Sequence, residues 1–231
     1  MPTTYDVKLI QKREIAENTL EFIIEKPKGF QYAAGQFGDL VLPASCGLGE
    51  KDKHGFSYAS APYEDRLAMA TRMRATSAWK NAMRKVPDGS MIQMLALWGK
   101  FTLPETTSTP VVFITGGIGI TPVRGIVAQA THDRTAHKMT LLYANRTPAQ
   151  AAYVEDFKHF AAQNRNFTYT LVNTGTEGRI DAAKIRAHVP DVKAPLYYLC
   201  GPEGMVNGMR ELLSGLGVDK TRIKTEKFEG Y

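Results

Sequence analysis

The spacing of apolar residues changes midway along this chain of 231 residues. In the first half, segments such as 5–11 and 67–74 alternate apolar and polar side chains, as half-buried strands do. In the second half, segments 111–115 and 196–200 are continuous apolar runs, and the stretches between such runs have helical periodicity. Continuous runs are typical of parallel strands that are buried on both faces. The chain therefore contains two different folding patterns.

The segment LPETTSTP separates these patterns and has the composition of a linker. We therefore expect an α+β two-domain protein with domains 1–105 and 106–231. The first domain is predicted to be an antiparallel six-stranded β-barrel with one helix over 77–86, which begins at Thr76 or Ser77. The second is predicted to be an α/β doubly wound parallel sheet. Its helices are expected over 122–130, 148–164, 181–188 and 205–216.

Composition excludes several classes of protein. No run of 18 or more apolar residues occurs, which argues against a membrane span, and the N-terminus lacks the apolar core of a secretory signal. The two cysteines, Cys46 and Cys200, cannot form a four-thiolate iron–sulfur or zinc site. We therefore expect a cytoplasmic protein without such a metal centre.

The charge balance is modestly basic, with 29 Lys and Arg against 23 Asp and Glu and a net charge of +6. A positive surface attracts nucleic acid, acidic proteins and phosphate-bearing cofactors alike. The aromatic residues do not follow a basic stripe, so no nucleic-acid partner is expected.

A glycine-rich segment follows the first apolar run of the second half and precedes a predicted helix. Gly116, Gly117 and Gly119 would let backbone N–H groups approach phosphate oxygens, at the place where a doubly wound sheet binds a dinucleotide. Thr121 suits the N-cap of the helix and Pro122 its first position. A tight glycine turn that binds nothing is the alternative.

Three further segments carry chemical groups. Cys200, Gly201 and Pro202 end a strand before the helix that includes Met205, although a single cysteine there is more often a small buried apolar residue. The segment HGFSYASAP, residues 54–62, has aromatic rings with interleaved hydroxyl groups that could hold a flat ring and hydrogen-bond its edge. The alternative is a strand whose hydroxyl-bearing face is exposed to solvent. The chain ends in FEGY, and a terminal aromatic residue is usually frayed surface.

Taken together and in this order, these features resemble the ferredoxin–NADP reductase superfamily, over nearly the whole chain. Its members have an N-terminal flavin-binding barrel followed by a nicotinamide-binding domain. The flavin motif of the family, Arg-x-Tyr/Phe-Ser-x-x-Ser, is matched here by His54, Phe56, Ser57 and Ser60. The resemblance implies that Phe56 packs against FAD, that Ser57 hydrogen-bonds near its reactive nitrogen, and that Tyr58 belongs to the same cofactor-binding segment.

The resemblance also implies how the flavin phosphates are held. Thr76 and Ser77 match a family element that binds the pyrophosphate at a helix start. His54 stands where the family has a phosphate-binding arginine, and a neutral imidazole is a weaker partner for an anion. Either Arg72 or Arg74 is therefore expected to substitute, or flavin affinity is lower. We expect that FAD binding is retained.

In the second domain, the resemblance assigns the nicotinamide nucleotide to the glycine loop and to Gly201, Pro202 and Met205. It places Cys200 beside the nicotinamide, Tyr231 over the flavin, and Glu229 as a proton relay, with Glu226 as the competing carboxylate. Asn145 and Arg146 end the second strand of this domain, where the adenosine ribose is recognised. Because an arginine there can bind a 2′-phosphate, Arg146, with Arg179 as a helper, favours NADP(H) over NAD(H).

The implied function is transfer of a hydride from NADPH to FAD, followed by transfer of single electrons to a separate acceptor. That acceptor is expected to be a soluble protein, ferredoxin or flavodoxin, or a small molecule. An NADH-dependent reductase component of an oxygenase, or a ferric or flavin reductase, is the alternative enzyme. A non-catalytic flavin-binding relay or regulatory subunit is the alternative of another class.

Overall fold

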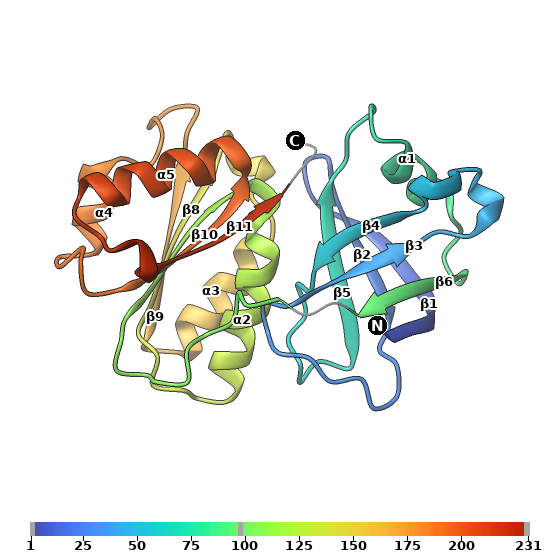
Figure 1. The fold of residues 1–231 in the computed structure, drawn as a ribbon, viewed down its shortest axis with the longest axis horizontal. Coiled ribbons are helices and arrows are strands. Elements are labelled where there is room, and N and C mark those ends of the chain that lie inside the picture. Colours follow the sequence, from blue (N-terminus) through green and yellow to red (C-terminus); the bar gives the residue numbers. More distant parts are fainter. Residues whose placement is uncertain (1–2, 97–98, 229–231) are drawn as a thin grey trace.

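The computed structural model describes residues 3–96 and 99–228, and it contains two sheets that lie side by side (Figure 1). The first sheet is antiparallel and has the strand order β4-β3-β6-β1-β2-β5. Its strands are β1 (Thr3–Ala16), β2 (Thr19–Glu25), β3 (Phe37–Val41), β4 (Lys53–Ser57), β5 (Arg66–Arg72) and β6 (Met91–Ala96). Helix α1 (Ala78–Lys85) and the 3-10 turns Ala44–Cys46 and Gly49–Lys51 belong to the same half.

Strand β1 connects the two parts of this barrel, because it pairs with a different strand along each part of its length. It pairs with β6 from Thr3 to Lys8 and with β2 from Leu9 onward. The segment after β4 closes the barrel on β5, where the Ala59 amide donates to the carbonyl oxygen of Ala68 at 2.7 Å. The side chains inside are apolar, and Leu9, Phe22 and Ile24 are fully buried.

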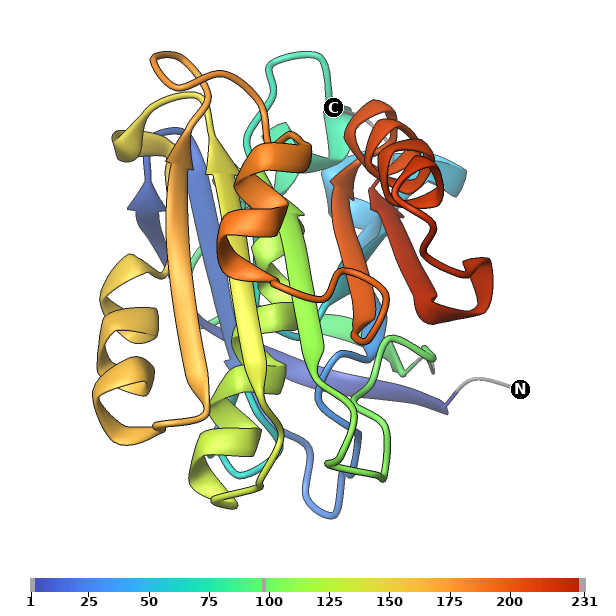
Figure 2. The ribbon, with the colours of Figure 1, turned by 90° about the vertical axis from the view of Figure 1, so that its left-hand side faces the viewer.

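The second sheet is parallel and has the strand order β11-β10-β7-β8-β9 (Figure 2). Its strands are β7 (Val111–Gly116), β8 (Met139–Asn145), β9 (Phe167–Asn173), β10 (Leu196–Pro202) and β11 (Ile223–Phe228). Its helices are α2 (Ile120–His132), α3 (Val154–Gln163), α4 (Ala182–His188) and α5 (Glu203–Gly215), with 3-10 turns at Gly117–Gly119, Pro148–Gln150 and Lys220–Arg222. Helices α2 and α3 cover one face, and α4 and α5 the other (Figure 1). The predicted α+β two-domain fold class is confirmed.

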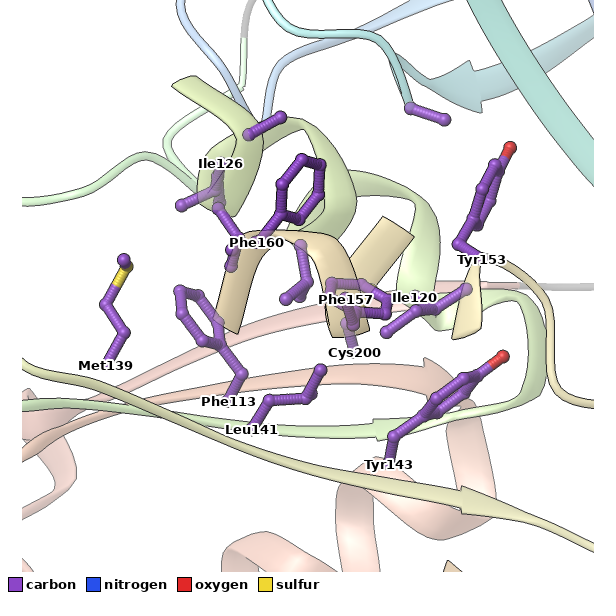
Figure 3. Close-up of a cluster of buried hydrophobic side chains, with 14 of the residues drawn as sticks. Phe113, Ile120, Ile126, Met139, Leu141, Tyr143, Tyr153, Phe157, Phe160 and Cys200 are labelled. Carbon is purple, nitrogen blue, oxygen red and sulfur yellow. The ribbon is translucent and has the colours of Figure 1, made fainter. Parts of the chain in front are cut away.

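Helix α2 packs against both halves of the molecule. One buried cluster joins Phe113 and Leu141 of the sheet to Ile120 and Ile126 of α2 (Figure 3), and the same cluster continues into Ala59, Ala61 and Phe101 of the first half. A Cβ at Gly125 of α2 would lie 2.8 Å from the carbonyl oxygen of Ser60. Only a glycine allows the helix to lie this close to the barrel backbone.

The helix expected over 148–164 begins later, at Val154, so its predicted start is wrong. Tyr153 adopts a left-handed conformation with φ 60°, and its hydroxyl donates to the buried carboxylate of Glu21 at 2.9 Å. The amide of Ala152 donates to the hydroxyl of Tyr143 at 3.0 Å. These long-range bonds stabilise a non-helical segment where the local apolar pattern is helical.

The predicted cap of α2 is also wrong. The helix begins at Ile120 with Gly119 as its N-cap, because the glycine segment Gly117–Gly119 is itself a 3-10 turn that continues into the helix. The Thr121 hydroxyl donates to the carbonyl oxygen of Ile118 at 3.1 Å. Pro122 is then the third helical residue, where its missing N–H still breaks no intrahelical bond. By contrast, the side chain of Ser77 accepts from the amide of Lys80 as the predicted N-cap of α1.

Strand β1 is longer than the predicted strand over 5–11, because it continues to Ala16 and turns at Asn18, whose φ is 53°. Within residues 3–96 and 99–228, no helix is both long and apolar enough to cross a bilayer.

Candidate active site

A cavity of about 830 Å³ lies between the two halves of the molecule. Its volume falls within the range of small-molecule and cofactor sites. Side chains and backbone from both sheets and from the start of α2 form its wall. The lining residues are Phe37, His54, Gly55, Phe56, Ser57, Ala70, Thr71, Lys80, Gly99, Lys100, Phe101, Ile118, Thr121, Lys224, Thr225, Glu226, Lys227 and Phe228.

Strand β4 contributes an aromatic wall to this cavity. The rings of His54 and Phe56 stack with their centroids 4.8 Å apart, and Trp79 of α1 packs against both rings. Burial, and then the charge of Lys80, lower the pKa of His54. Its imidazole is therefore neutral at pH 7 and extends a flat surface for a planar ligand.

A hydroxyl and a carboxyl meet across the cavity. Ser57 at the end of β4 donates a hydrogen bond to Glu226 Oε1 of β11, so the bond joins the two halves. Burial raises the pKa of Glu226 to about 7, although the bond from Ser57 opposes that rise. The carboxyl group is thus close to half-protonated at neutral pH, which suits proton exchange.

The glycine loop lies against the end of β10, at the point where the strand order of the parallel sheet reverses. A Cβ at Gly119 would lie 2.3 Å from the Cys200 carbonyl oxygen, and one at Gly116 would lie 2.4 Å from the Met205 sulfur. A Cβ at Gly201, whose φ is 147°, would lie 2.9 Å from the carbonyl oxygen of Gly116. Two strand ends can meet here only because these positions lack a Cβ.

Three buried oxygen atoms near this edge have no hydrogen-bond partner among the described residues. They are Thr115 Oγ1 at the end of β7, Asn145 Oδ1 at the end of β8, and Asn207 Oδ1 in α5. Buried polar atoms are normally satisfied. Unsatisfied atoms at the carboxyl ends of parallel strands are consistent with a polar ligand in this crevice.

The structure brings four of the predicted site residues to the cavity wall: His54, Phe56, Ser57 and Thr121. Tyr58 is fully buried inside the barrel, where its hydroxyl contacts the Met94 sulfur. Ser60 is buried beside Tyr32 and accepts from the amide of Ala68. The geometry therefore gives Tyr58 and Ser60 packing contacts within the barrel.

Cys200 also lies away from the cavity wall. Its side chain is fully buried in the cluster that α2 covers (Figure 3). Burial, and then Glu226, raise the pKa of its thiol well above the usual value. The predictions for Glu229 and Tyr231 concern residues outside the described part of the chain. Phe228 is the described aromatic residue of that segment, and it lines the cavity.

The residues predicted to hold the flavin phosphates divide between two places. Ser77 caps α1. A second cavity, of about 330 Å³, is lined by Asn18, Arg72, Met73, Arg74, Ala75, Thr76 and Gln150. The Arg72 guanidinium donates to the carbonyl oxygens of Glu17 at 2.7 Å and Gln150 at 3.0 Å, so it bridges the two halves.

Comparison with known proteins gives the same picture. Residues 113–211 match the family described as "Oxidoreductase NAD-binding domain". Ferredoxin–NADP reductase B of Sorangium cellulosum is 25% identical over an alignment that covers 97% of this chain and 98% of that protein. A ferredoxin–NADP⁺ reductase from Neisseria gonorrhoeae, solved with bound FAD and NADP, superposes with a TM-score of 0.81 at 17% identity, covering 98% of this chain and 99% of that one.

Residues 113–211 thus belong to this NAD-binding oxidoreductase family, and over nearly its whole length the chain is similar to ferredoxin–NADP reductases. By class it is an NAD(P)H-dependent flavin oxidoreductase, and binding of FAD and NAD(P) is a property of the family. The propane 2-monooxygenase reductase component of Rhodococcus jostii is 25% identical over 88% of this chain and 57% of that protein. The chain spans 37% to 63% of the length of several further curated relatives.

The cavity of this reductase fits a flavin. Four phenylalanine rings offer apolar surface for a flat ring system, while Ser57 and Glu226 offer a donor and an acceptor at one edge. The lining residues Lys80, Lys100, Lys224 and Lys227 are cationic, as a phosphate-bearing ligand requires.

Sequence reasoning missed Lys80 and Phe228, which line the cavity of the reductase. One signal could have indicated Lys80. It lies in the first turn of α1, directly after the N-cap region, where the helix dipole disfavours a cation. A lysine at such a position suggests an anion nearby. Phe228 carries no comparable local signal, because only the sheet order brings β11 to the cavity.

Proposed function

We propose that this reductase transfers a hydride from NADPH to FAD held in the cavity, and that it then passes single electrons to a separate acceptor such as ferredoxin or flavodoxin. The observation that carries the proposal is the hydrogen bond between Ser57 and Glu226 beside the aromatic wall. When bound, FAD accepts two electrons and a proton as hydride from NADPH, which is oxidised to NADP⁺, and releases the electrons one at a time.

The residues of the flavin half have separable roles in this proposal. Phe56 packs against the flavin ring, and the Ser57 hydroxyl is the hydrogen-bond donor at the ring edge. Glu226 accepts a hydrogen bond from the Ser57 hydroxyl, and its pKa of about 7 lets it take up or release a proton at little cost.

The nicotinamide half would hold the dinucleotide at the carboxyl ends of β7, β8 and β10. The backbone of the glycine loop, with Gly117 at φ 55°, faces that edge, and the unsatisfied oxygens of Thr115 and Asn145 are available to hydroxyl or amide groups of the ligand. Gly201, Pro202 and Met205 would form the opposite wall of the crevice.

Arg146 supports NADPH as the donor. It directly follows Asn145 at the end of β8 and is exposed at the same edge of the sheet. Arg179 is also exposed, and we assign it a helping role at the 2′-phosphate. The predicted roles of Cys200 beside the nicotinamide, Glu229 as a relay and Tyr231 over the flavin remain predictions.

The acceptor assignment rests on charge. Lys100 and Lys227 are exposed and Lys224 half-buried, and all three line the cavity. A positive mouth attracts an acidic electron-carrier protein and accelerates its encounter. The likeness to the Rhodococcus protein favours one alternative, a reductase component that serves an oxygenase.

Anaerobic stopped-flow mixing of the FAD-loaded protein with NADPH and with NADH tests the proposal. We expect rapid flavin bleaching with NADPH and a lower kcat/KM with NADH. Arg146→Gln should lower kcat/KM for NADPH at least about tenfold, because a charged hydrogen bond is lost, with little change for NADH. Arg165→Gln is the matched control. Arg165 is exposed just before β9, so it lies at the amino ends of the strands, away from the proposed nucleotide site at their carboxyl ends.

Three outcomes would overturn parts of this proposal. Equal kcat/KM for the two nucleotides in the parent protein contradicts the preference for NADPH. Bleaching that is followed by reduction of an oxygenase component, but not of ferredoxin or flavodoxin, supports the alternative acceptor. No bleaching with either nucleotide contradicts an oxidoreductase and supports a relay subunit.

A further inference from the structure

We propose that Lys80 is the cation that binds the phosphate groups of the flavin in this protein, in place of the arginine for which His54 is substituted. The inference rests on the proposed function, because it assumes that FAD occupies the cavity. It goes further in assigning the phosphate subsite to a residue of helix α1 that the sequence motif does not include.

The position of Lys80 is the first argument. Its side chain belongs to the wall of the cavity, next to His54 and Thr71, although only 3% of the residue is exposed. The Lys80 ammonium group donates to the carbonyl oxygen of Arg72 at 2.9 Å. This bond anchors the ammonium group on the β4–β5 side of the cavity, where Phe56 and Ser57 also lie.

The helix supplies the second argument. Lys80 is in the first turn of α1, and Ser77 caps its amide. The N-terminal amides of a helix carry partial positive charge, and a lysine side chain added there is electrostatically unfavourable unless an anion is present. A buried ammonium group on the cavity wall, at the positive end of a helix, is complementary to a phosphate.

The other cations suggested by the sequence are directed elsewhere. The Arg72 guanidinium donates to the carbonyl oxygens of Glu17 in its own half and of Gln150 in the other half. Arg74 is exposed at the smaller cavity. His54 is stacked on Phe56, and its lowered pKa leaves it neutral. Of the other lysines in the lining, Lys224 donates to the carbonyl oxygen of Thr102 at 3.1 Å, Lys227 pairs with Glu203 at 2.9 Å, and Lys100 is exposed. Lys80 is the buried lysine on the wall that contains the flavin motif.

The charged and titratable groups around Lys80 determine how binding depends on pH. His54 of β4 and Arg72 and Arg74 at the end of β5 lie on its side; Lys224, Glu226 and Lys227 of β11 line the same cavity. Burial, and then Arg74, lower the pKa of Lys80 to about 8. Affinity for an anion should therefore be full below that pH and fall as the pH rises above it.

The test compares FAD and FMN, which carry phosphate, with riboflavin, which does not. Their dissociation constants for the flavin-free protein are measured by flavin fluorescence at constant ionic strength. We expect Lys80→Met to weaken FAD and FMN about tenfold to a hundredfold, because a charged hydrogen bond is lost, and to leave riboflavin within about threefold. Lys80→Arg should restore binding. Lys85→Gln, at the exposed end of the same helix, should change nothing.

A second measurement needs no variant. Between pH 7 and pH 9 the affinity of the parent protein for FAD should fall by up to about tenfold, while that for riboflavin stays level. An equal loss of riboflavin and FAD in Lys80→Met would show a packing role and overturn the assignment, as would unchanged FAD affinity. If the parent protein binds none of the three flavins, the proposed function fails, and that result is distinct from a failure of the Lys80 assignment.

Discussion

Within two turns of α2, the contact between the two halves changes from an open cavity, here called the hollow region, to a closely packed set of ion pairs around Arg124, here called the sealed region. Ile118, just before the helix, and Thr121 in its first turn line the cavity. In the next turn, Arg124 forms ion pairs with Glu64 of the barrel half and with Asp156 of α3. The guanidinium group also donates to the carbonyl oxygen of Ala59 at 3.3 Å. One helix thus borders both an open cavity and a partly buried polar contact.

The two regions of this contact serve different purposes: one holds the halves together and the other leaves room for ligands. The region around Arg124 holds the halves in one relative position, because the bonds from Arg124 to Glu64 and to the Ala59 carbonyl oxygen are lost if the halves move. The hollow region leaves room for ligands and keeps a partly buried carboxyl that is costly to ionise. Besides the Ser57–Glu226 bond in the cavity, the halves are therefore held by groups that do not line the proposed cofactor site.

Replacing Arg124 should have the largest effect on this contrast. Arg124→Met removes charged hydrogen bonds to two partly exposed carboxylates, and we expect a loss of about 3 kcal/mol in the free energy of unfolding, measured in urea with the flavin-free protein. Lys158→Met is the control, because the Lys158–Glu155 pair is exposed and should contribute less than about 0.5 kcal/mol. Equal losses for the two variants would show that the sealed region is not special.

Tyr153→Phe should have an intermediate effect. It removes the hydroxyl that donates to Glu21, whose side chain is only 2% exposed and is also paired with Arg13. We expect a loss of about 2 kcal/mol, because a buried carboxylate loses one of its donors. Tyr63→Phe, at an exposed position, is the matched control. A loss below about 0.5 kcal/mol for Tyr153→Phe would indicate that the Arg13 pair is sufficient.

Glu226→Gln should have the smallest effect on stability, and the effect should depend on pH. The pKa of Glu226 is raised to about 7, so the folded protein holds a proton that the unfolded chain releases at lower pH. The parent protein should therefore lose stability as pH rises from about 4.5 to 7. Because glutamine does not titrate, the loss of stability between pH 5 and pH 8 should be smaller in Glu226→Gln than in the parent protein. We expect a difference of about 1 kcal/mol, since solvent in the cavity weakens the interaction. Identical pH profiles in urea unfolding would contradict a raised pKa.

Features formed by neighbouring residues could be predicted from the sequence. The change from alternating to continuous apolar runs predicted both sheets, and Ser77 predicted the start of α1, because each depends on contacts within a few residues. The glycine loop was also predictable. The absence of Cβ atoms at Gly116 and Gly119 is visible in the sequence before their close neighbours in β10 and α5 are known.

Features that depend on contacts between distant segments could not be predicted. Ser57 and Glu226 are 169 residues apart, and the sequence of β11 does not reveal that Glu226 faces Ser57 across the cavity. The start of α3 was missed for the same reason, because the left-handed turn at Tyr153 is stabilised by Glu21 on the other half. The contacts of Arg72 between the halves could not be predicted, because its partners are backbone carbonyl oxygens, which any residue type supplies.

The glycine at position 125 restricts how the two halves of such reductases can be exchanged. A Cβ there would meet the carbonyl oxygens of Ser60 at 2.8 Å and Tyr58 at 3.0 Å, so the helix surface and the backbone after β4 form a matched pair. A chimera that combines this barrel with the nicotinamide half of another reductase must keep a glycine at this position of the incoming helix. Otherwise the two halves would not fit together in the relative position seen here, even when both parts fold correctly.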